Sequence, residues 1–407
     1  MLPLVLDYLR THSFRDLKND HGVNARISSN RKKISLNYDQ IEVKSGDKLA
    51  EQCRGLIVAN ITNSPFHKDD LWMDVPGYVL KLVAWPMSRF YNAGDGAASN
   101  INWDDPNLSV FEKLDGTMIT FYHCDNEWHV ATRSMPDADL PICQDHIEIG
   151  NMTFSELFWI ALRNAFVTNN SDLAAFTNWV DSTFDKRCTY VFELTSSFNR
   201  VVVKYDETRV TLLAIRDITT GFEKSIYNEN LCVSRPKRWS LRSVDLVASF
   251  VNSIDATKLE GAVVCDSHFN RIKIKSMSWC FASRSKDTVI ASRRNAFIVI
   301  VKGQLDDVLS LLSDESSRKL LKLQNGLMHL THMIDKEYQK MSHECDGSRK
   351  HFATLVFTSP LRNYSSLFFS FFDKKYSTAT SWLIDLATKG KLSDRTIDMF
   401  IEHIDCL

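Results

Sequence analysis

A lysine set between apolar residues is the first side chain in this sequence whose surroundings suggest chemistry. Lys113 lies in FEKLDGTMITFY, residues 111–122, directly ahead of Leu114 and an Asp-Gly pair. Asp-Gly between β-forming residues is a strong hairpin signal, so one interpretation of the stretch is purely structural. The other interpretation is that Lys113 is a nucleophile. Lys-x-Asp-Gly is short enough to occur by chance, and taken alone it leaves the hairpin favoured.

Three other charged residues begin or follow short apolar, strand-like stretches. Glu193 follows the apolar residues of YVFEL, Glu260 and Gly261 open LEGAVV, and Arg54 stands beside a glycine in CRGL. Each has an ordinary interpretation, as a solvated strand end, a turn and a surface arginine. Arg54 precedes Lys113 in the sequence, and Glu193 and Glu260 follow it. This order makes a shared site worth considering.

A fourth stretch, RIKIKS, alternates isoleucine with lysine. Because strand side chains repeat with period two, Ile272 and Ile274 face one side while Lys273 and Lys275 face the other. The lysines could be the wet face of an amphipathic strand. However, KxDG, a strand with Glu, EGxV and KxK occur in this order over about 160 residues, and their joint occurrence by chance is small.

The ordered set resembles the motifs of the covalent nucleotidyltransferases, the superfamily of DNA ligases, RNA ligases and mRNA capping enzymes. Motifs I, III, IV and V correspond to KLDG at 113–116, FEL at 192–194, EGAVV at 260–264 and KIK at 273–275. Further stretches are similar to the bacteriophage-type RNA ligase 1 family: CRG at 53–55, PMSRFYN at 86–92, FNRVVVKY at 198–205, LLAIR at 212–216 and KIKSMSW at 273–279. The resemblance covers nearly the whole chain.

The resemblance implies an ATP-dependent RNA ligase with Mg²⁺ or Mn²⁺. In such enzymes a lysine takes AMP from ATP, the AMP moves to an RNA 5′-phosphate, and an RNA 3′-hydroxyl then displaces it. The resemblance implies that Lys113 is the nucleophile, that Lys273 and Lys275 contact the α-phosphate, and that Arg54 and Arg89 contact the pyrophosphate. It also implies that Glu260 binds the metal and that Glu193 accepts from a ribose hydroxyl. Glu112 and Arg133 would lie in the nucleotide pocket, and Asp115 and Gly116 would form the turn that carries the nucleophile.

The nucleophile must be an uncharged amine. At the reference lysine pKa of about 10.4, roughly 0.04% of the amine is neutral at pH 7, so such a site has to lower this pKa. Partial burial and the positive charges of Lys273, Lys275 and a bound divalent cation all act in that direction.

Two arginines depart from the family pattern, and the residue that stacks on adenine is left open by it. Arg89 and Arg133 stand where the family generally has lysine, and a planar guanidinium fork is not equivalent to a point charge. The aromatic residue that would stack on adenine is not identified. Tyr91, Phe192 and Trp279 are candidates, although core packing is the preferred interpretation of each.

The elements that must position these residues indicate an α+β fold with largely antiparallel sheets. Short runs rich in β-branched and aromatic residues recur between about 35 and 280. These are RGLIVAN, YVLKLVAW, TMITFYH, WHVATR, TYVFEL, NRVVVKY, RVTLLAIR, GAVVCD and RIKIKS. Helices are expected at 1–10, after a Thr153–Glu156 capping box, and at 172–184.

Beyond residue 285 the hydrophobic period becomes helical. Apolar residues three and four apart form one stripe, and LDDVLSLL at 305–312 predicts a shorter helix. The stripe comprises Leu320, Leu323, Leu327, Leu330, Ile334 and Met341. We therefore expect an adenylyltransferase domain over 1–282 and an all-helical, RNA-specificity domain over 283–407. Related DNA ligases and capping enzymes usually carry a β-rich domain there instead.

Composition restricts the class of protein. With 49 basic and 50 acidic residues, the chain is not a polycation that coats nucleic acid, so a polyanion site must be local.

Nine scattered cysteines without a CxxC pair suit a reducing compartment and are interpreted as buried thiols. No apolar run reaches membrane-spanning length and the first residues lack a basic leader. We expect a cytoplasmic monomer, in the host cytoplasm if the source is viral.

RNA binding shows only faintly in the sequence. Between 250 and 302, nine basic residues outnumber four acidic ones, which makes a local basic face plausible. The basic members are Lys258, Arg271, Lys273, Lys275, Arg284, Lys286, Arg293, Arg294 and Lys302. SRPKRWSLR at 234–242 either extends that face or is a solvated loop.

The expected partner is RNA with 5′-phosphate and 3′-hydroxyl ends, and in the resembled family the helical tail favours broken tRNA anticodon loops. Alternatives are a DNA ligase or mRNA guanylyltransferase built on the same motifs, and a catalytically silent RNA-binding protein that keeps the fold.

Overall fold

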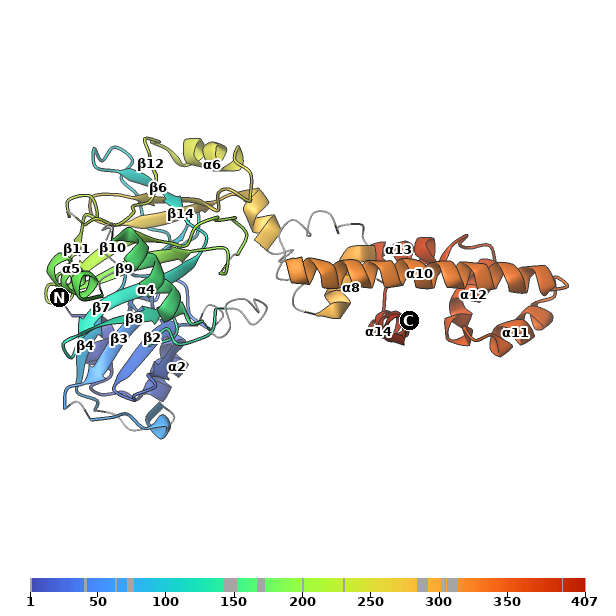
Figure 1. Ribbon diagram of the computed structural model, residues 1–407, viewed down its shortest axis with the longest axis horizontal. Coiled ribbons are helices and arrows are strands. Elements are labelled where there is room, and N and C mark those ends of the chain that lie inside the picture. The colour runs from blue at the N-terminus through green and yellow to red at the C-terminus, as the bar shows by residue number, and fades with distance from the viewer. Residues whose placement is uncertain are drawn as a thin grey trace. The chain divides into compact units, whose positions relative to one another are not determined.

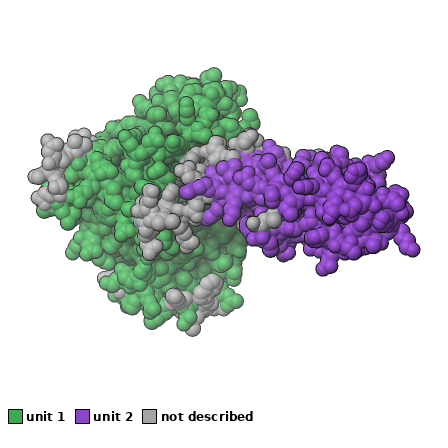
Figure 2. Space-filling model, turned by 45° about the vertical axis from the view of Figure 1, so that its right-hand side comes forward, with its two compact units in different colours: residues 1–280 green, residues 281–407 purple. Residues whose placement is uncertain are grey.

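A computed structural model describes residues 2–39, 42–62, 64–71, 77–142, 152–166, 173–199, 201–229, 231–283, 292–301, 303, 305, 314–389 and 391–406. The chain divides into two compact units, Met1–Cys280 and Phe281–Leu407, shown in two colours in Figure 2. Each has its own hydrophobic core. The functional division expected from the sequence, at residue 282, stays a prediction.

The first sheet of the N-terminal unit is antiparallel, in the order β1-β2-β3-β4. Its strands are β1 (Val23–Ile27), β2 (Lys33–Tyr38), β3 (Arg54–Asn60) and β4 (Leu80–Ala84). Helices α1 (Leu4–Tyr8), α2 (Phe14–His21) and α3 (Lys48–Gln52) share its core, and η1 (Lys68–Leu71) is a short 3₁₀ helix. The expected N-terminal helix is confirmed, and β3 begins at Arg54 as expected.

The second sheet has the order β11-β10-β9-β7-β8 (Figure 1). Its strands are β7 (Thr117–Cys124), β8 (Glu127–Thr132), β9 (Cys188–Thr195), β10 (Arg209–Asp217) and β11 (Glu223–Lys224). Helices α4 (Phe154–Ala165) and α5 (Leu173–Thr183) bury apolar residues against it. The predicted capping box is present, because Thr153 and Glu156 each accept from the other's backbone N–H.

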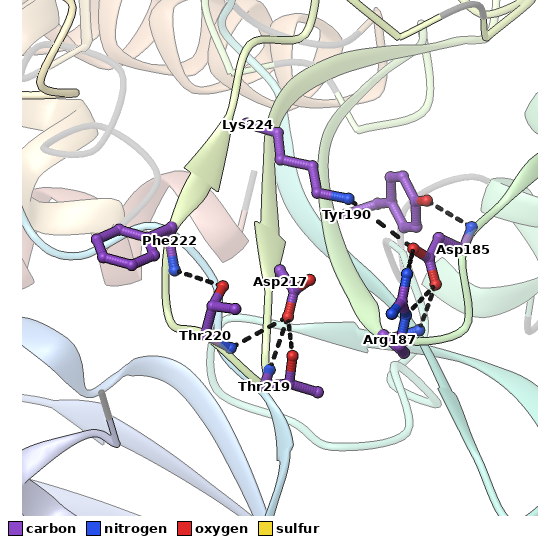
Figure 3. Close-up of polar contacts among 8 residues, drawn as sticks. All are labelled: Asp185, Arg187, Tyr190, Asp217, Thr219, Thr220, Phe222 and Lys224. Carbon is purple, nitrogen blue, oxygen red and sulfur yellow. Dashed lines mark hydrogen bonds and ion pairs between the residues drawn. The ribbon is translucent and has the colours of Figure 1, made fainter.

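A tight turn joins β10 to β11 at one end of this sheet. The Asp217 carboxylate accepts hydrogen bonds from the backbone N–H groups of Thr219 and Thr220, as Figure 3 shows. Asp side chains stabilise turns in this way by satisfying the backbone locally. The turn sets where Phe222 and Lys224 project.

The third sheet carries the functional residues and has the order β12-β6-β13-β14-β5. Its strands are β5 (Tyr91–Asn92), β6 (Ser109–Lys113), β12 (Arg238–Trp239), β13 (Gly261–Cys265) and β14 (Arg271–Lys275). All pairs are antiparallel except β14 with β5. Helix α6 (Val244–Asn252) buries Val247 and Val251 in the core on one face of this sheet, alongside Val264 and Ile272.

Two predictions about local structure are wrong. The Asp-Gly pair after Lys113 does not form a hairpin, because the strands on either side, β6 and β7, belong to different sheets. The valine-rich run NRVVVKY at 199–205 is not a strand where it is described. Its Val202 and Val203 N–H groups instead donate to the side chain of Asp115, so they are not available to a neighbouring strand.

The regular elements described in the C-terminal unit are all helices (Figure 1). Its helices are α8 (Arg293–Val301), α10 (Asp314–Glu344), α11 (Arg349–Thr358), η3 (Arg362–Tyr364), α12 (Ser365–Phe372), α13 (Ala379–Thr388) and α14 (Asp394–Cys406). The predicted apolar stripe is confirmed, since all six of its residues lie buried along α10. The expected helix at 305–312 lies outside the described residues apart from Leu305. None of the described helices combines the length and apolarity needed to cross a membrane.

Two predictions about surface chemistry need correction. Arg293 and Arg294 are not free members of a basic face, because α14 supplies their carboxylate partners, Asp405 and Asp398. The cysteines are not all buried thiols, since Cys232 and Cys406 are exposed. Arg284, Lys286 and Lys302 lie outside the described residues.

Candidate active site

The third sheet arranges its charged residues in rows that run across the strands. Gly261 on the central strand β13 lies opposite Lys113 on β6 and Lys275 on β14. In the next row of the same face, Val263 lies opposite Lys273. Side chains directly opposite each other are about 5 Å apart at Cβ, so lysines from distant parts of the sequence come together around a glycine.

The alternation of side chains fixes which face these lysines occupy. Ile272 and Ile274 are 4% and 8% exposed and belong to the core beside α6, whereas Lys273 and Lys275 are only partly buried on the opposite face. The prediction that the two lysines share a face is therefore confirmed.

Glu260, immediately before β13, connects the two outer lysines of the first row. Its side chain is almost completely buried, with Oε2 2.7 Å from Lys113 Nζ and Oε1 2.9 Å from Lys275 Nζ. A buried carboxylate is costly unless it is paired and hydrogen-bonded, and here both oxygens have a cationic partner. Glu260 thus holds the amine of Lys113 at a defined point on the sheet face.

The chain leaves Lys113 through a turn that is tied down by Asp115. This carboxylate is 4% exposed, and its Oδ2 accepts from the backbone N–H groups of Val202 and Val203 at 2.8 Å and from Trp279 Nε1 at 3.0 Å. The Asp115 N–H donates in turn to the hydroxyl of Tyr205. This network explains why an aspartate follows the lysine. A solvent-exposed hairpin would not require a buried carboxylate that bonds to distant residues.

Gly116 allows the same turn to approach strand β9. A Cβ at this position would lie 2.3 Å from the carbonyl oxygen of Leu194, closer than any side chain tolerates. The Gly116 N–H donates to Glu193 Oε1 at 3.1 Å. The turn therefore brings Glu193, from the second sheet, to the nucleophile candidate Lys113.

Burial raises the pKa of Glu193 to about 7. The Glu260 carboxylate adds to this increase, while the positive charges of Lys113 and Arg54 and the Gly116 N–H oppose it. Glu193 is thus poised between its neutral and ionised forms near neutral pH, which is typical of functional carboxylates in partly desolvated sites.

Arginines from the first sheet and the segment after it lie in the same region. Arg54 lies over the ring of Phe90 at 5.0 Å, and Arg89 lies between Tyr38 at 4.6 Å and Tyr91 at 4.7 Å. Cation–π contacts of this kind hold a guanidinium in place without neutralising it.

Several donors of these guanidinium groups are buried without a partner. Among the described residues, Arg54 Nε and Nη1 and Arg89 Nη1 make no hydrogen bond. Buried polar groups are nearly always hydrogen-bonded, so permanent cations with unused donors indicate a binding site for an anion.

Lys273 adds to the positive charge of this region. Its pKa is lowered to about 8, mainly by burial and to a smaller extent by the neighbouring charges of Lys275, Lys113, Arg54 and Arg89. Neighbouring cations raise the free energy of one another's charged forms, and a bound anion lowers that free energy.

A pocket of about 340 Å³ contains most of the predicted site residues. Its lining includes Arg54, Arg89, Glu112, Lys113, Arg133, Glu193, Lys273 and Lys275. Glu260 does not line it directly but bonds to two lysines that do. The structure thus brings the predicted residues together, from three sheets, while their individual roles stay predictions.

The candidates for adenine stacking do not line this pocket. Phe192 is fully buried in a core, Trp279 Nε1 bonds to Asp115, and the Tyr91 hydroxyl accepts from Gly46 N–H. The aromatic walls are instead Tyr38, Phe90 and Phe111.

A period-two argument could have found Phe111. It lies two residues before Lys113 on one strand and therefore faces the same side. Arg271, two residues before Lys273, also lines the pocket and could have been found in the same way.

The carboxylates present fit a hard divalent cation. Mg²⁺ is typically held by one or two carboxylates together with substrate phosphates and water. Glu260 is such a carboxylate, with its oxygens beside the amines of Lys113 and Lys275. These oxygens would hold the cation close to the candidate nucleophile.

Comparisons with known proteins relate this chain to RNA ligases. A family model described as RNA ligase matches residues 52–290. A protein of Autographa californica nuclear polyhedrosis virus, which carries the name of a bifunctional polynucleotide kinase/RNA ligase, is 28% identical over 288 residues, or 68% of this chain and 37% of that protein. An RNA ligase of Rhodothermus phage RM378 is 23% identical over 160 residues, 34% of each chain. The chain therefore spans little more than a third of the length of these relatives.

Solved structures of Naegleria gruberi RNA ligase are also similar in part. The form with pyrophosphate has a TM-score of 0.32 and 15% identity, covering 44% of this chain and 51% of that one. A variant solved with ATP and manganese has a TM-score of 0.31 and 14% identity over the same shares.

Proposed function

This chain belongs to the RNA ligase family of the bacteriophage type, and we propose that it is an ATP-dependent RNA ligase that joins 5′-phosphate and 3′-hydroxyl ends. The observation that carries the proposal is the row Lys113–Gly261–Lys275 with Glu260 between the two amines, facing arginines that have unused donors. An amine beside a cluster of cations is suited to attack a phosphate and to stabilise the charge that develops there.

In the first step the nitrogen of Lys113 attacks the α-phosphate of ATP. The new P–N bond forms as the bond between the α-phosphorus and its bridging oxygen breaks, the amine loses its extra proton, and pyrophosphate leaves. Lys273 and Lys275 would contact the α-phosphate, since they lie on the face of Lys113. Arg54 and Arg89 would hold the leaving pyrophosphate with the donors that are otherwise unused.

In the second step an oxygen of the RNA 5′-phosphate attacks the same phosphorus, the P–N bond breaks, and Lys113 leaves as a free amine. In the third step the 3′-hydroxyl attacks the RNA 5′-phosphate, AMP leaves and a phosphodiester forms. Catalysis of both steps depends mainly on positioning and on stabilising the charge of phosphate oxygens. Lys273 and Lys275 would serve in each, because the AMP phosphate stays beside them.

The carboxylates have separate parts in this proposal. Glu260 would bind Mg²⁺ or Mn²⁺, which stabilises negative charge on phosphate oxygens, and Glu193 would accept a hydrogen bond from a ribose hydroxyl. Glu112 and Arg133 border the nucleotide, and Asp115 and Gly116 position the turn after the nucleophile. Phe90 and Phe111 are the aromatic walls available to the base.

The helical unit is assigned to the RNA. All the catalytic candidates lie before residue 276, so the helices from α8 onward have no evident part in the chemistry. We propose that Phe281–Leu407 selects or positions the RNA, with nicked tRNA anticodon loops as the favoured substrate, and that the protein acts as a monomer in the cytoplasm, that of the host if the source is viral.

The proposal is tested by labelling the protein with α-labelled ATP or GTP and Mg²⁺, followed by a chase with 5′-phosphorylated RNA or with nicked DNA. We expect labelling by ATP and transfer of the label to RNA. Preferential labelling by GTP would instead indicate a guanylyltransferase, and transfer to nicked DNA alone a DNA ligase. RNA binding without any label would indicate a catalytically silent protein.

A further inference from the structure

A second pocket, of about 640 Å³, adjoins the nucleotide pocket and shares Phe111, Leu213 and Arg271 with it. Its other walls are the segment that leads into β6, the loop after β11, strand β12 with the residues after it, and the turn between β13 and β14. We name it the Tyr227 groove, after the aromatic residue at its wall.

The Tyr227 groove has more basic than acidic side chains. Its lining contains Lys224, Arg238, Arg242 and Arg271, and a single carboxylate, Asp266. Two of the four cations have carboxylate partners. The amine of Lys224 lies 3.8 Å from Asp185 (Figure 3), and Arg271 Nη2 lies 2.6 Å from Glu223.

The other two cations are not neutralised. Arg242 donates to the backbone carbonyl oxygen of Asp105, and the Arg238 guanidinium lies 5.1 Å over the ring of Tyr227. Among the described residues neither forms an ion pair. Asp266 accepts hydrogen bonds within its own turn and keeps its negative charge, which offsets only one of these two cations. The groove therefore carries an uncompensated positive charge that fits an anionic ligand.

The groove also offers an aromatic surface that is held in position. Tyr227 is 41% exposed, and its ring is stacked on Phe111 at a centroid distance of 6.0 Å and an interplanar angle of 14°. Arg235 fixes the loop that carries Tyr227 by donating to the backbone oxygens of Ile226 and Leu231. A large exposed ring in a rigid loop loses little entropy when a flat ligand stacks on it.

We propose that the Tyr227 groove binds single-stranded RNA, with a base packed against the exposed part of the Tyr227 ring and phosphates at Arg238 and Arg242. A positive groove with an exposed aromatic ring is the usual design for single-stranded nucleic acid. This inference rests on the proposed function for the identity of the strand. It also assigns a role to the basic cluster at 234–242, part of which, Arg235, supports the loop.

The position of the groove limits which part of the RNA it contacts. Ser109, Cys265 and Arg271 form a row at its wall, four residues along the strands from Lys113 and Lys275. Four residues of a strand span roughly 13 Å. The groove therefore contacts nucleotides away from the ends being joined, and it contributes to binding only when the RNA is long enough.

The inference is tested by fluorescence anisotropy on the full chain, with 5′-phosphorylated single-stranded RNAs of about twelve and about three nucleotides. The variants are Tyr227→Ala, Tyr227→Phe and Arg238→Ala. Arg209→Ala is the matched control, because Arg209 is an exposed arginine of the same unit that pairs with Glu207 and lies outside both pockets. Lysyl-AMP formation and thermal unfolding are measured for each variant.

For the longer RNA, Tyr227→Ala should weaken binding roughly five- to a hundredfold, the value of one stacked base. Arg238→Ala should reduce the slope of log K against log salt by about 0.7, as expected for one lost phosphate contact. Tyr227→Phe and Arg209→Ala should bind as the wild type does. The short RNA should be affected by none of them.

Wild-type affinity and salt dependence in both Tyr227→Ala and Arg238→Ala would overturn the inference, as would equal losses for the short and the long RNA. Failure of the proposed function is distinguishable, because it would show as no lysyl-AMP in the wild-type protein. The binding measurement decides the role of the groove in either case.

Discussion

Glu260 has two kinds of partner available to it, the amines of Lys113 and Lys275 and, under the proposed function, a divalent cation. Both of its oxygens are occupied by the amines in this structure. A cation on the same oxygens would compete with the two amines for them, so metal binding would release the amine of Lys113 from its present hydrogen bond.

Lys273 gives the nucleotide pocket a pH dependence that can be measured. Its pKa is lowered to about 8 from an ordinary value of 10.5, so the free protein loses this charge as the pH rises through 8. ATP is an anion, and its Kd should therefore increase by up to about tenfold between pH 7 and 9. Isothermal titration at constant ionic strength would show it.

The control for this prediction is Lys273→Arg, which keeps its charge at these pH values and should remove most of the effect. The free energy of unfolding changes with pH in the opposite direction to ATP affinity, because it increases as the pH rises. A lysine whose pKa is lowered on folding makes the folded state gain stability between about pH 8 and 10.5, where only the unfolded chain keeps the proton. A wild-type Kd that is constant from pH 7 to 9 would show that Lys273 does not contact the nucleotide as a titrating group.

Arg54 should be important for only one of the chemical steps. Its buried unused donors are assigned to pyrophosphate, which takes part in lysyl-AMP formation but not in sealing. Arg54→Ala should therefore slow the reaction with ATP roughly a hundredfold, for a loss of about 3 kcal/mol, and slow the sealing of pre-adenylylated RNA much less. Lys275→Ala should slow both reactions. Equal losses for Arg54→Ala in the two assays would place this residue elsewhere.

At the scale of elements, the site depends on close contact between strands β13 and β14. A Cβ on Gly261 would lie 2.3 Å from the carbonyl oxygen of Ile274 and 2.8 Å from Cα of Lys275, and backbone atoms cannot move aside as a flexible side chain can. Gly261→Ala should therefore lower the free energy of unfolding by about 1–3 kcal/mol, seen as a lower Tm, and reduce lysyl-AMP formation by displacing Lys275.

Gly96→Ala is the matched control for this substitution. Apart from its chain neighbours, no described residue has an atom within 4 Å of the place where its Cβ would be, so stability should change by less than about 0.5 kcal/mol. If Gly261→Ala behaved like Gly96→Ala, the rows of the third sheet would not be as tightly spaced as the structure has them.

The sequence predicts these elements unevenly, for physical reasons. The alternation in RIKIKS and the stripe along α10 depend on local periodicity, and both predictions are confirmed. The run at 199–205 has strand composition, but the N–H groups of Val202 and Val203 bond to Asp115, more than 80 residues earlier. Partners so distant cannot be deduced from local pattern.

The candidate site shows the same limit. Residue types and motif order predict which residues belong to it, whereas the row Lys113–Gly261–Lys275 depends on the register of strands about 150 residues apart. Likewise, the carboxylates of α14 that pair with Arg293 and Arg294 are not evident from the sequence around those arginines.

At the scale of the whole molecule, the two units should be separable. The buried core described for Phe281–Leu407 runs from Ala296 to Ile401, and the catalytic candidates belong to Met1–Cys280. A chain truncated after residue 283 should still form lysyl-AMP but should discriminate less between a nicked tRNA stem-loop and an unstructured RNA. Retained adduct formation is the control for folding. Full preference for the stem-loop in the folded truncation would show that the helices are structural only.

The central claim is that Lys113 is the residue that carries AMP, and peptide mapping tests it most directly. The full-length protein is incubated with ATP and Mg²⁺, digested, and the modified lysine located by mass spectrometry. We expect AMP on Lys113, in an acid-labile, base-stable linkage, and none in Lys113→Ala, which retains Lys273 and Lys275 in the same pocket. AMP on Lys273 or Lys275 instead, or an adduct of undiminished yield in Lys113→Ala, would contradict the account.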